Sequence, residues 1–321
     1  MSQKKFFKLI IKSNSTLVKL SSVAILMFFA INSLQAQQEP MYSQYMFNMV
    51  QLNPAYAGNR AVDNITAMFR KQWIGIEGAP TTATISWDRR EAESNIGYGL
   101  QIYNDNIGVE STIGLQGFYS YRIPFAKSSL ALGLSAGILN YRALYSQVVT
   151  TTGGDPVFRE DVNGLRPTVG IGALYETEHW YAGFSIPALL QTKITSENVQ
   201  VTTGASNHYF LTGGYIFDLS PDLKLKPSVL FKAVQGAPLE MDLNVNAWFQ
   251  NFIGLGASYR TGDSFVGMFE LQLTPVLRLG YAYDFLISNL KTYSQGGTHE
   301  LMLRYEFGGQ KTQRVLSPRY Y

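Results

Sequence analysis

The chain has 321 residues and a formal net charge of +3 at pH 7, and only 15% of its residues are charged, against about 25% in ordinary soluble domains. Aromatic residues reach 13%, with 20 tyrosines and 19 phenylalanines, and 29 residues are glycine. The chain contains no cysteine, which excludes disulfides, thiolate metal sites, cysteine nucleophiles and a lipoprotein anchor.

The pattern of residues 1–36 predicts a cleavable secretion signal. An apolar run at 23–31 is followed by "NSLQAQQ", with a small-residue cleavage site after Ala36. A single membrane anchor is the less favoured alternative, because the run is shorter than the ~20 residues that span a bilayer. The basic residues of this region are Lys4, Lys5, Lys8, Lys12 and Lys19. Their removal lowers the formal charge from +3 by five to −2, so no basic surplus indicates nucleic-acid binding.

The next segment, residues 37–60, does not alternate between apolar and polar residues. It ends in "YMFNMVQLNPAYAGNR", which concentrates Asn, Pro and Gly. Asn53 and Pro54 favour a turn, because proline fixes φ and asparagine caps the backbone locally. We predict an ordered, non-β segment that either plugs a barrel lumen or offers a docking surface to a partner.

From residue 61 to residue 307 the chain repeats segments that alternate between apolar and polar residues, separated by turn residues, and this period of two is typical of β-strands. An even number of antiparallel strands closes a bacterial barrel, with short periplasmic turns and longer external loops. We therefore expect an external loop at 146–163 and periplasmic turns at 219–222 and 273–275. The fourteen predicted strands are 61–71, 81–90, 95–104, 110–124, 128–142, 164–176, 179–187, 206–218, 222–234, 239–250, 252–261, 264–274, 276–286 and 297–307.

Each predicted strand has one strongly apolar face and one charged or small face. In 276–286, one face carries leucine, tyrosine and phenylalanine, and the other carries Arg278, Gly280, Ala282 and Asp284. A soluble β-sandwich would alternate in the same way. Long strands, aromatic residues near the strand ends and a small-residue face favour a transmembrane antiparallel outer-membrane β-barrel, an all-β fold embedded in outer-membrane lipid.

Charged residues on the last strands point inward if these strands pair in chain order. Unpaired charges in a narrow lumen would be costly, so we expect them to pair across strands as a structural network. A selectivity surface in an open pore is the alternative. The six residues of this predicted network are Glu270, Arg278, Asp284, Glu300, Arg304 and Glu306.

Two further segments that do not alternate lie between the first two predicted strands and after the last one. "FRKQWIGIEGAPTT" closes the first hairpin, and its glycines and proline mark turn geometry. Trp73, like Tyr56 upstream, offers a large contact area. The last strand ends in the aromatic Phe307, and residues 308–321 follow as a periplasmic tail, either a disordered extension or a docking peptide.

No constellation of residues predicts catalysis or metal binding. His179, His208 and His299 are the only histidines, and none has the spacing of a metal site. Ser206 and Asn207 precede His208, but adjacent residues of a strand point to opposite faces, which argues against a catalytic triad. We therefore predict that the protein is not an enzyme and carries no cofactor.

Three motifs, "NPAYAGNR", "FRKQWIGIEGAPTT" and "SPRYY", resemble the PorP/SprF family of the type IX secretion system of Bacteroidota, and the resemblance extends from about residue 38 to the C-terminus. The family suggests no catalytic role for the matching positions, which are structural or bind partners. They are Asn53, Pro54, Ala55, Tyr56, Ala57 and Gly58 in the first motif, and Arg70, Gln72, Trp73, Gly75, Gly78, Ala79 and Pro80 in the second.

The resemblance implies a non-enzymatic outer-membrane barrel that serves protein secretion. Such barrels associate with a periplasmic ring, made of a lipoprotein and its partner subunit, and with an OmpA-like peptidoglycan-binding protein. Some are partners of large secreted adhesins, which carry a type B C-terminal signal domain and in some cases act in gliding motility. A general porin or solute channel is the alternative function.

Overall fold

A computed structural model of the protein describes residues 41–60, 62–91, 94–148, 160–190, 194–195, 200–201, 207–235 and 237–308. The predicted signal peptide and the predicted tail after residue 308 lie outside the described residues. The chain divides into two units, one of 1–36 with 236–238 and the other of 37–235 with 239–321, and the elements below all belong to the second. No helix in the described part of the chain is long and apolar enough to cross a membrane.

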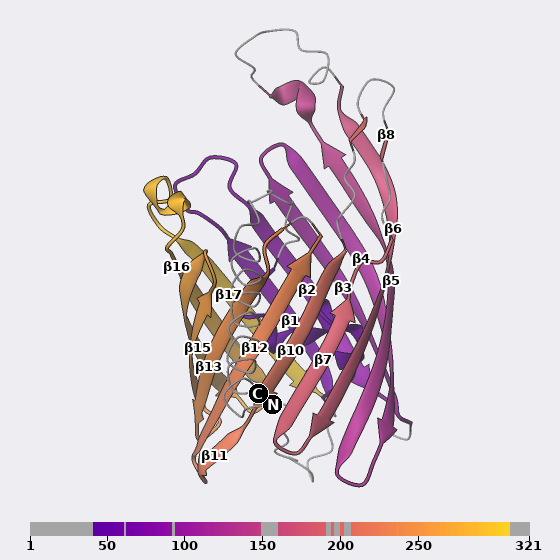
Figure 1. Ribbon diagram of the computed structural model, residues 1–321, viewed down its shortest axis with the longest axis vertical. Coiled ribbons are helices and arrows are strands. Elements are labelled where there is room, and N and C mark those ends of the chain that lie inside the picture. Colours follow the sequence, from indigo (N-terminus) through magenta and orange to yellow (C-terminus); the bar gives the residue numbers. More distant parts are fainter. Residues whose placement is uncertain are drawn as a thin grey trace, which may run out of the picture. The chain divides into compact units, whose positions relative to one another are not determined.

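One large antiparallel sheet contains nearly all the described β-structure (Figure 1). Its strands are β1 (Asp63–Lys71), β2 (Thr81–Arg90), β3 (Ile96–Ile107), β4 (Glu110–Pro124), β5 (Ser128–Ala143), β6 (Val162–Thr177), β7 (Trp180–Ile186), β10 (His208–Tyr215), β11 (Phe217–Ser220), β12 (Leu223–Val234), β13 (Glu240–Phe249), β14 (Ile253–Arg260), β15 (Ser264–Thr274), β16 (Leu277–Leu286) and β17 (Thr298–Phe307). A separate two-stranded sheet is formed by β8 (Ile194–Thr195) and β9 (Gln200–Val201).

The large sheet closes into a barrel. Neighbours in the chain pair with each other, β1 pairs with β17, and β10 pairs with β12. The strands β10 and β11 both pair with β12 and are separated only by Ile216. Together they correspond to the single predicted strand 206–218. Next to this break, Pro227 of β12 lies opposite Tyr215 and has no N–H for the ladder. On the β7 side, the Ile216 N–H donates to the His179 carbonyl at 2.7 Å. The prediction of a fourteen-stranded barrel is confirmed.

The two ends of the barrel differ in the length of their links. At one end, here called the turn end, the links are short: 91–95, 125–127, 178–179, 221–222, 250–252 and 275–276. The opposite end, here called the loop end, has longer links, among them 72–80, 144–161, 187–207 and 287–297. The predicted short turns and the predicted external loop lie at the turn end and the loop end respectively, which is the arrangement typical of outer-membrane barrels.

The two faces of the sheet have opposite chemistry, as the alternation predicts. On β15, Phe265 and Phe269 are exposed on the outside, whereas Val266, Met268 and Glu270 are buried on the inside. The same pattern recurs around the barrel, because successive residues of a strand point to opposite faces. The outer surface is therefore suited to lipid, and the inner face carries the buried charged and polar residues together with methionine and small side chains.

The barrel is uneven in height. The strands β5 and β6 have 16 residues each, whereas β7 has 7 and β10 has 8. A strand of 16 residues is about 54 Å long, which exceeds an apolar band of about 25 Å even when the strand is tilted by about 40°. The sheet around β4, β5 and β6 therefore continues beyond the membrane at the loop end. In Figure 1 these strands reach toward the top of the view.

The lumen contains the N-terminal segment of the described chain. Residues 41–60, here called the plug, form three single turns, η1 (Tyr45–Phe47), η2 (Met49–Gln51) and η3 (Pro54–Tyr56), drawn in indigo inside the barrel (Figure 1). Aromatic and methionine side chains of the plug pack against lumen residues such as Met68 and Met302 in the main apolar cluster. Two further single turns, η4 (Tyr145–Gln147) and η6 (Asn289–Thr292), lie in loop-end links.

Candidate functional site

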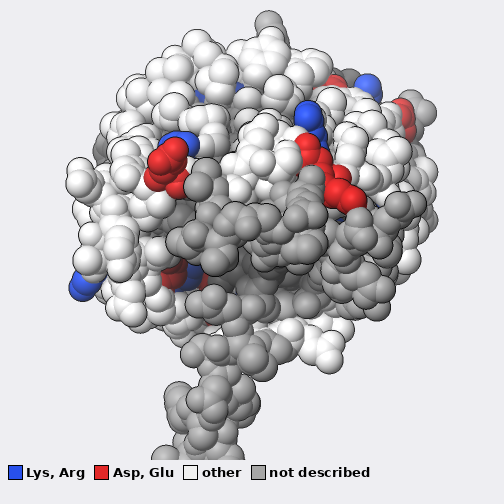
Figure 2. Space-filling view, turned by 90° about the horizontal axis from the view of Figure 1, so that it is seen from above, with Lys and Arg blue, Asp and Glu red and all other residues white. Residues whose placement is uncertain are grey.

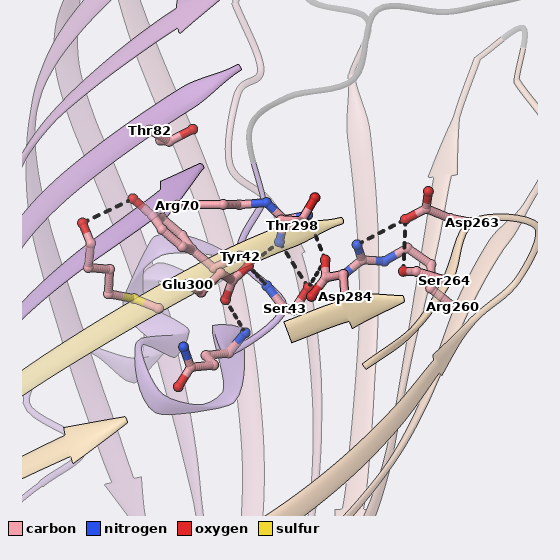
Figure 3. A network of polar contacts seen from close by, with 12 residues as sticks. Tyr42, Ser43, Arg70, Thr82, Arg260, Asp263, Ser264, Asp284, Thr298 and Glu300 are labelled. Atoms are coloured by element: carbon pink, nitrogen blue, oxygen red, sulfur yellow. Dashed lines mark hydrogen bonds and ion pairs between the residues drawn. The ribbon is translucent and has the colours of Figure 1, made fainter. Parts of the chain in front are cut away.

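The first turn of the plug is held by two carboxylates near the loop end. Glu300 of β17 accepts hydrogen bonds from the backbone N–H of Ser43 at 2.6 Å and of Gln44 at 3.0 Å. Asp284 of β16 accepts a hydrogen bond from the Ser43 hydroxyl at 2.8 Å. The carboxylates therefore satisfy N–H groups at the start of η1 that have no partner within the turn (Figure 3).

Two arginines lie beside this turn, and one of them pairs with both carboxylates. Arg70 of β1 forms ion pairs with Asp284, at 2.9 Å, and with Glu300, and donates to the Ser43 hydroxyl at 2.9 Å. On the other side, Arg260 of β14 approaches Asp242, Asp263 and the same hydroxyl at 3.1, 3.4 and 3.5 Å. Buried charges are tolerated when they are paired and hydrogen-bonded, and here the plug supplies part of that bonding.

Two tyrosines of the plug carry their hydroxyl groups to the barrel wall. Tyr42 donates to the Thr84 hydroxyl at 2.9 Å, and the Tyr45 hydroxyl accepts from the Asn244 amide at 2.7 Å. Burial raises the pKa of both tyrosines above the ordinary value, so both are neutral at physiological pH. They attach the plug by hydrogen bonds that carry no charge.

A second group of charged side chains, centred on Arg304, contacts the plug at the end of η1. The guanidinium of Arg304 donates to the Phe47 carbonyl and lies 5.5 Å from the Phe47 ring centroid. Its nearest carboxylate, Glu270, is 3.9 Å away and also binds Arg278 and the Trp248 indole N–H, each at 2.9 Å. Arg304 therefore links the plug backbone to the wall.

The structure brings the six predicted network residues to the lumen side of the wall, with Arg278 and Glu306 half-buried and the other four buried. They form three groups rather than one. Glu306 pairs with Arg60 at 2.5 Å, at the end of the plug. Partners contributed by distant strands and by the plug, namely Arg60, Asp242 and Arg260, were not predicted from the sequence, and Arg70 was predicted only as a residue of the second motif.

The "NPAYAG" motif forms the second half of the plug. Asn53 caps η3 by accepting a hydrogen bond from the Ala55 N–H at 2.9 Å, and its amide donates to the carbonyls of Ala173, at 3.0 Å, and Phe184, at 3.3 Å. Pro54 occupies the first position of the turn, where its missing N–H costs nothing. Tyr56 is half-buried beside an apolar cluster of Ala55, Ala131 and Leu174.

Glycines of the wall make room for this motif. A Cβ added to Gly133 would lie 2.1 Å from the Ala55 nitrogen, and one added to Gly172 would lie 2.0 Å from the Asn53 side-chain oxygen. At Gly97, the added atom would lie 2.1 Å from the carbonyl oxygen of Ala57. Because the wall lacks side chains at these places, the plug backbone lies directly against the strands.

The last residues of the plug form a dense set of hydrogen bonds at the turn end. Gly58 has φ of 60°, its N–H donates to Asp88 at 3.1 Å, and its carbonyl accepts from Arg90 at 2.9 Å. The Asn59 side chain accepts from Arg122 at 2.7 Å, and the Ser120 hydroxyl donates to the Ala57 carbonyl at 2.7 Å. The six residues of the first family motif are thus all engaged inside the barrel.

The second motif lies at the loop end. Arg70 belongs to the lumen group above, whereas residues 72–80 form the β1–β2 link, which the bond from Gln72 N–H to Pro80 carbonyl closes at 2.9 Å. Trp73, Gly75 and Gly78 have φ of 47°, 99° and 72°, and Ala79 and Pro80 are buried.

Backbone hydrogen bonds tie this link to its neighbours. The Ile74 N–H donates to the Gly297 carbonyl at 2.9 Å, and the Ile74 carbonyl accepts from Gln295 N–H at 3.0 Å. On its other side, the Gly108 N–H donates to the Gly78 carbonyl at 2.7 Å. The link is therefore a fixed part of the loop end, and its Trp73 does not share a surface with Tyr56 of the plug.

The histidines lie on separate elements. His179 is in the β6–β7 turn and stacks on Tyr215, His208 is buried on β10 beside Phe210, and His299 binds the Tyr281 hydroxyl. Ser206 lies outside the described residues. Among the described residues, no group of histidine and acidic side chains could hold a metal ion.

Little free space is left between plug and wall at the turn end. A cavity of about 50 Å³ is lined by residues that include Asn59, Arg60, Asp88, Tyr181 and Lys226. A water molecule takes about 30 Å³ of liquid volume, whereas pockets for small-molecule ligands are about 300–1,000 Å³. This cavity has room for water only.

Several solved outer-membrane proteins resemble the chain distantly. Omp33, an outer-membrane protein of Acinetobacter baumannii, has a TM-score of 0.47 and 8% identity, over 78% of this chain and 100% of its own. The toluene transporter TbuX of Ralstonia pickettii has a TM-score of 0.47 and 10% identity, over 81% and 93%. For the translocator domain of the autotransporter NalP of Neisseria meningitidis, the values are 0.42 and 12%, over 82% and 94%.

A search of curated protein sequences finds no match. A family model does match, and it covers residues 34–305, which include the plug, both motifs and nearly the whole barrel. The chain therefore belongs to the PorP/SprF family of type IX secretion system membrane proteins.

Proposed function

We propose that this protein is a non-enzymatic accessory barrel of the outer membrane, which holds a secreted adhesin-like protein at its loop end and docks to the periplasmic ring at its turn end. The client would be recognised through its type B C-terminal signal domain. The observation that carries the proposal is the filled lumen, in which residues 41–60 occupy the space that a channel would need.

The charges of the lumen support a scaffold rather than a pore. In an open channel, charged side chains line water and select ions. Here Arg70, Asp284 and Glu300 bind one another and the plug backbone, and Arg304 donates to the plug at the Phe47 carbonyl. The charges therefore serve to hold a segment of the chain.

The proposal includes export and orientation. Residues 1–36 would be removed after Ala36, and the turn end would face the periplasm, as short turns do in outer-membrane barrels. The ring lipoprotein with its partner subunit, and the OmpA-like protein, would meet the turn end or the tail 308–321. The client would meet the loop end, where the described surface carries few charged side chains (Figure 2).

The test combines co-purification with conductance. A tagged full-length copy is extracted from native outer membrane in mild detergent, and the co-purifying proteins are identified by mass spectrometry. We expect a large protein with a type B C-terminal signal domain, and no ion conductance of the purified barrel in a planar bilayer. A lone barrel that conducts ions would overturn the proposal in favour of a porin.

A further inference from the structure

The strand β6 extends beyond its described pairs with β7 at the loop end. Its pairs with β7 end at Ile171, opposite Ile186, whereas its pairs with β5 continue to Val162. Beyond Ile171, no strand of the described part of the chain pairs with β6 on the β7 side. Residues 163–169 on that side are here called the β6 edge.

One hydrogen bond shows which backbone groups belong to this edge. The Leu189 N–H donates to the Val169 carbonyl at 2.7 Å, from the β7 side. Because the N–H and C=O of a strand residue point the same way and alternate along the strand, Pro167, Leu165 and Asn163 also direct their backbone groups to this side. Proline has no N–H, and its position here fits an edge, where no donor is used.

The β6 edge lies outside the hydrocarbon layer. Unpaired backbone groups in lipid cost several kcal/mol each, so exposed sheet edges do not occur there. The length of β6 also places its first residues above the apolar band, and Leu165, with 68% of its surface exposed, stands on the outer face of this part. The edge is thus presented to the aqueous phase on the loop-end side.

We propose that the β6 edge is a β-augmentation site, at which an extended segment of the secreted client adds a strand to the barrel sheet. This inference rests on the proposed function, since it names where that client is held. Backbone hydrogen bonds would supply the affinity, with Asn163 and Leu165 offering both N–H and C=O and Pro167 a C=O. Residues outside the edge would contribute side-chain contacts only.

A client strand fits the edge better than a second copy of the chain does. Two barrels inserted in one membrane have the same orientation, so their β6 strands run parallel to each other. A two-fold axis along such strands places identical residues at the same height. In a parallel pair, however, only one of two residues at the same height directs its N–H and C=O groups to the partner strand, so this symmetry cannot match donors with acceptors. A strand from a separate protein has no such constraint.

The experiment uses Leu165, where a proline removes an edge N–H and leaves the bonds to β5 intact. Leu165→Pro is compared with Leu165→Thr, which keeps the N–H and changes the side chain by a similar amount. Both variants are expressed as full-length barrels, and unboiled gel migration checks that each barrel is folded. We expect Leu165→Pro to lower the co-purified client at least fivefold and Leu165→Thr to lower it less than twofold.

Hydrogen exchange supplies a second readout that does not depend on a variant. The amide protons of Asn163 and Leu165 should exchange rapidly in the free barrel and at least tenfold more slowly when the client is bound, whereas that of Arg166, which points to β5, should change little. A photo-crosslinker at Asn163 should join the barrel to an extended segment of the same client.

Each other outcome overturns the inference. If the client co-purifies equally with both variants and the Asn163 amide is unchanged, the β6 edge is not the site, and the proposed function stands. A crosslink to a second copy, or to another part of the same chain, replaces the client as the occupant. If the wild-type barrel holds no client at all, the proposed function fails and the inference fails with it.

Discussion

The first turn of the plug meets buried charges, whereas the motif residues 53–57 lie against glycines and neutral polar groups. Ser43 and Gln44 are bound by Glu300, while Asn53 and Ala55 lie against Gly172 and Gly133. The first arrangement depends on every partner of a charge being present, and the second depends on the wall having no side chain. The two halves should therefore respond to different kinds of substitution.

The largest effect is expected from Arg70→Leu. The substitution leaves Asp284 and Glu300 without their shared guanidinium, and breaking a buried ion pair costs about 3–5 kcal/mol. Urea unfolding of the barrel in phospholipid vesicles measures the loss. Arg89→Leu is the matched control on β2, because Arg89 is partly exposed and lies 3.7 Å from its carboxylate. Equal losses in the two variants would contradict the role of the loop-end charges.

The steric half is tested by Gly133→Val. The new side chain would meet the plug backbone at Ala55, and overpacking of this kind costs about 3 kcal/mol. We expect faster hydrogen exchange of residues 53–58 and measurable ion conductance as the plug is displaced. Gly267→Val is the control, since a Cβ at Gly267 meets nothing within 4 Å. A motif that stays protected in Gly133→Val would show that the glycine is not needed for space.

Arg304→Leu should have a smaller effect than Arg70→Leu. It removes the bond to the Phe47 carbonyl, and a hydrogen bond to a charged group is worth about 2 kcal/mol, but Glu270 keeps Arg278 and the Trp248 N–H. The expected result is a lower urea midpoint and a partial loss of the fast-migrating unboiled band. Unchanged heat-modifiability would contradict the placement of Arg304 between plug and wall.

The smallest effect on stability is expected from Trp73→Ala, at about 0.5 kcal/mol, because Trp73 is in a half-exposed link fixed by its backbone. If this link contacts the client, co-purification should fall while membrane insertion is unchanged. Tyr56→Ala should behave in the opposite way, with lower stability and faster exchange in the plug. Loss of the Trp73→Ala protein from the membrane would instead indicate a structural role.

The alternation of residues predicted the barrel well, because lipid outside and a polar lumen inside impose a period of two on every strand. The predicted strand 128–142 differs from β5 by one residue. The break after Tyr215 was missed, although Pro227 in the paired strand could have indicated it. Such local signals are readable because they depend on neighbours in the chain.

The contacts of the plug could not be predicted in the same way. Arg70 meets Asp284 and Glu300 only because the barrel closes and brings β1 beside β17. The spaces left by Gly133 and Gly172 become visible only when the register of β5 and β6 is known. Long-range register is fixed by closure of the whole sheet and not by any segment of it. The motif residues could therefore be identified from the sequence, but their contact partners could not.

The position of Glu300 has a consequence for the order of assembly. The plug is attached to the first strand, but the carboxylate that binds its first turn belongs to the last strand. Arg70 and Glu300 also face each other across the β1–β17 seam. If the barrel closed around an empty lumen, these charges would be buried without their hydrogen bonds to the Ser43 and Gln44 N–H groups. Seam closure and capture of the N-terminal segment should therefore be one cooperative step during insertion, completed only when the final strand arrives.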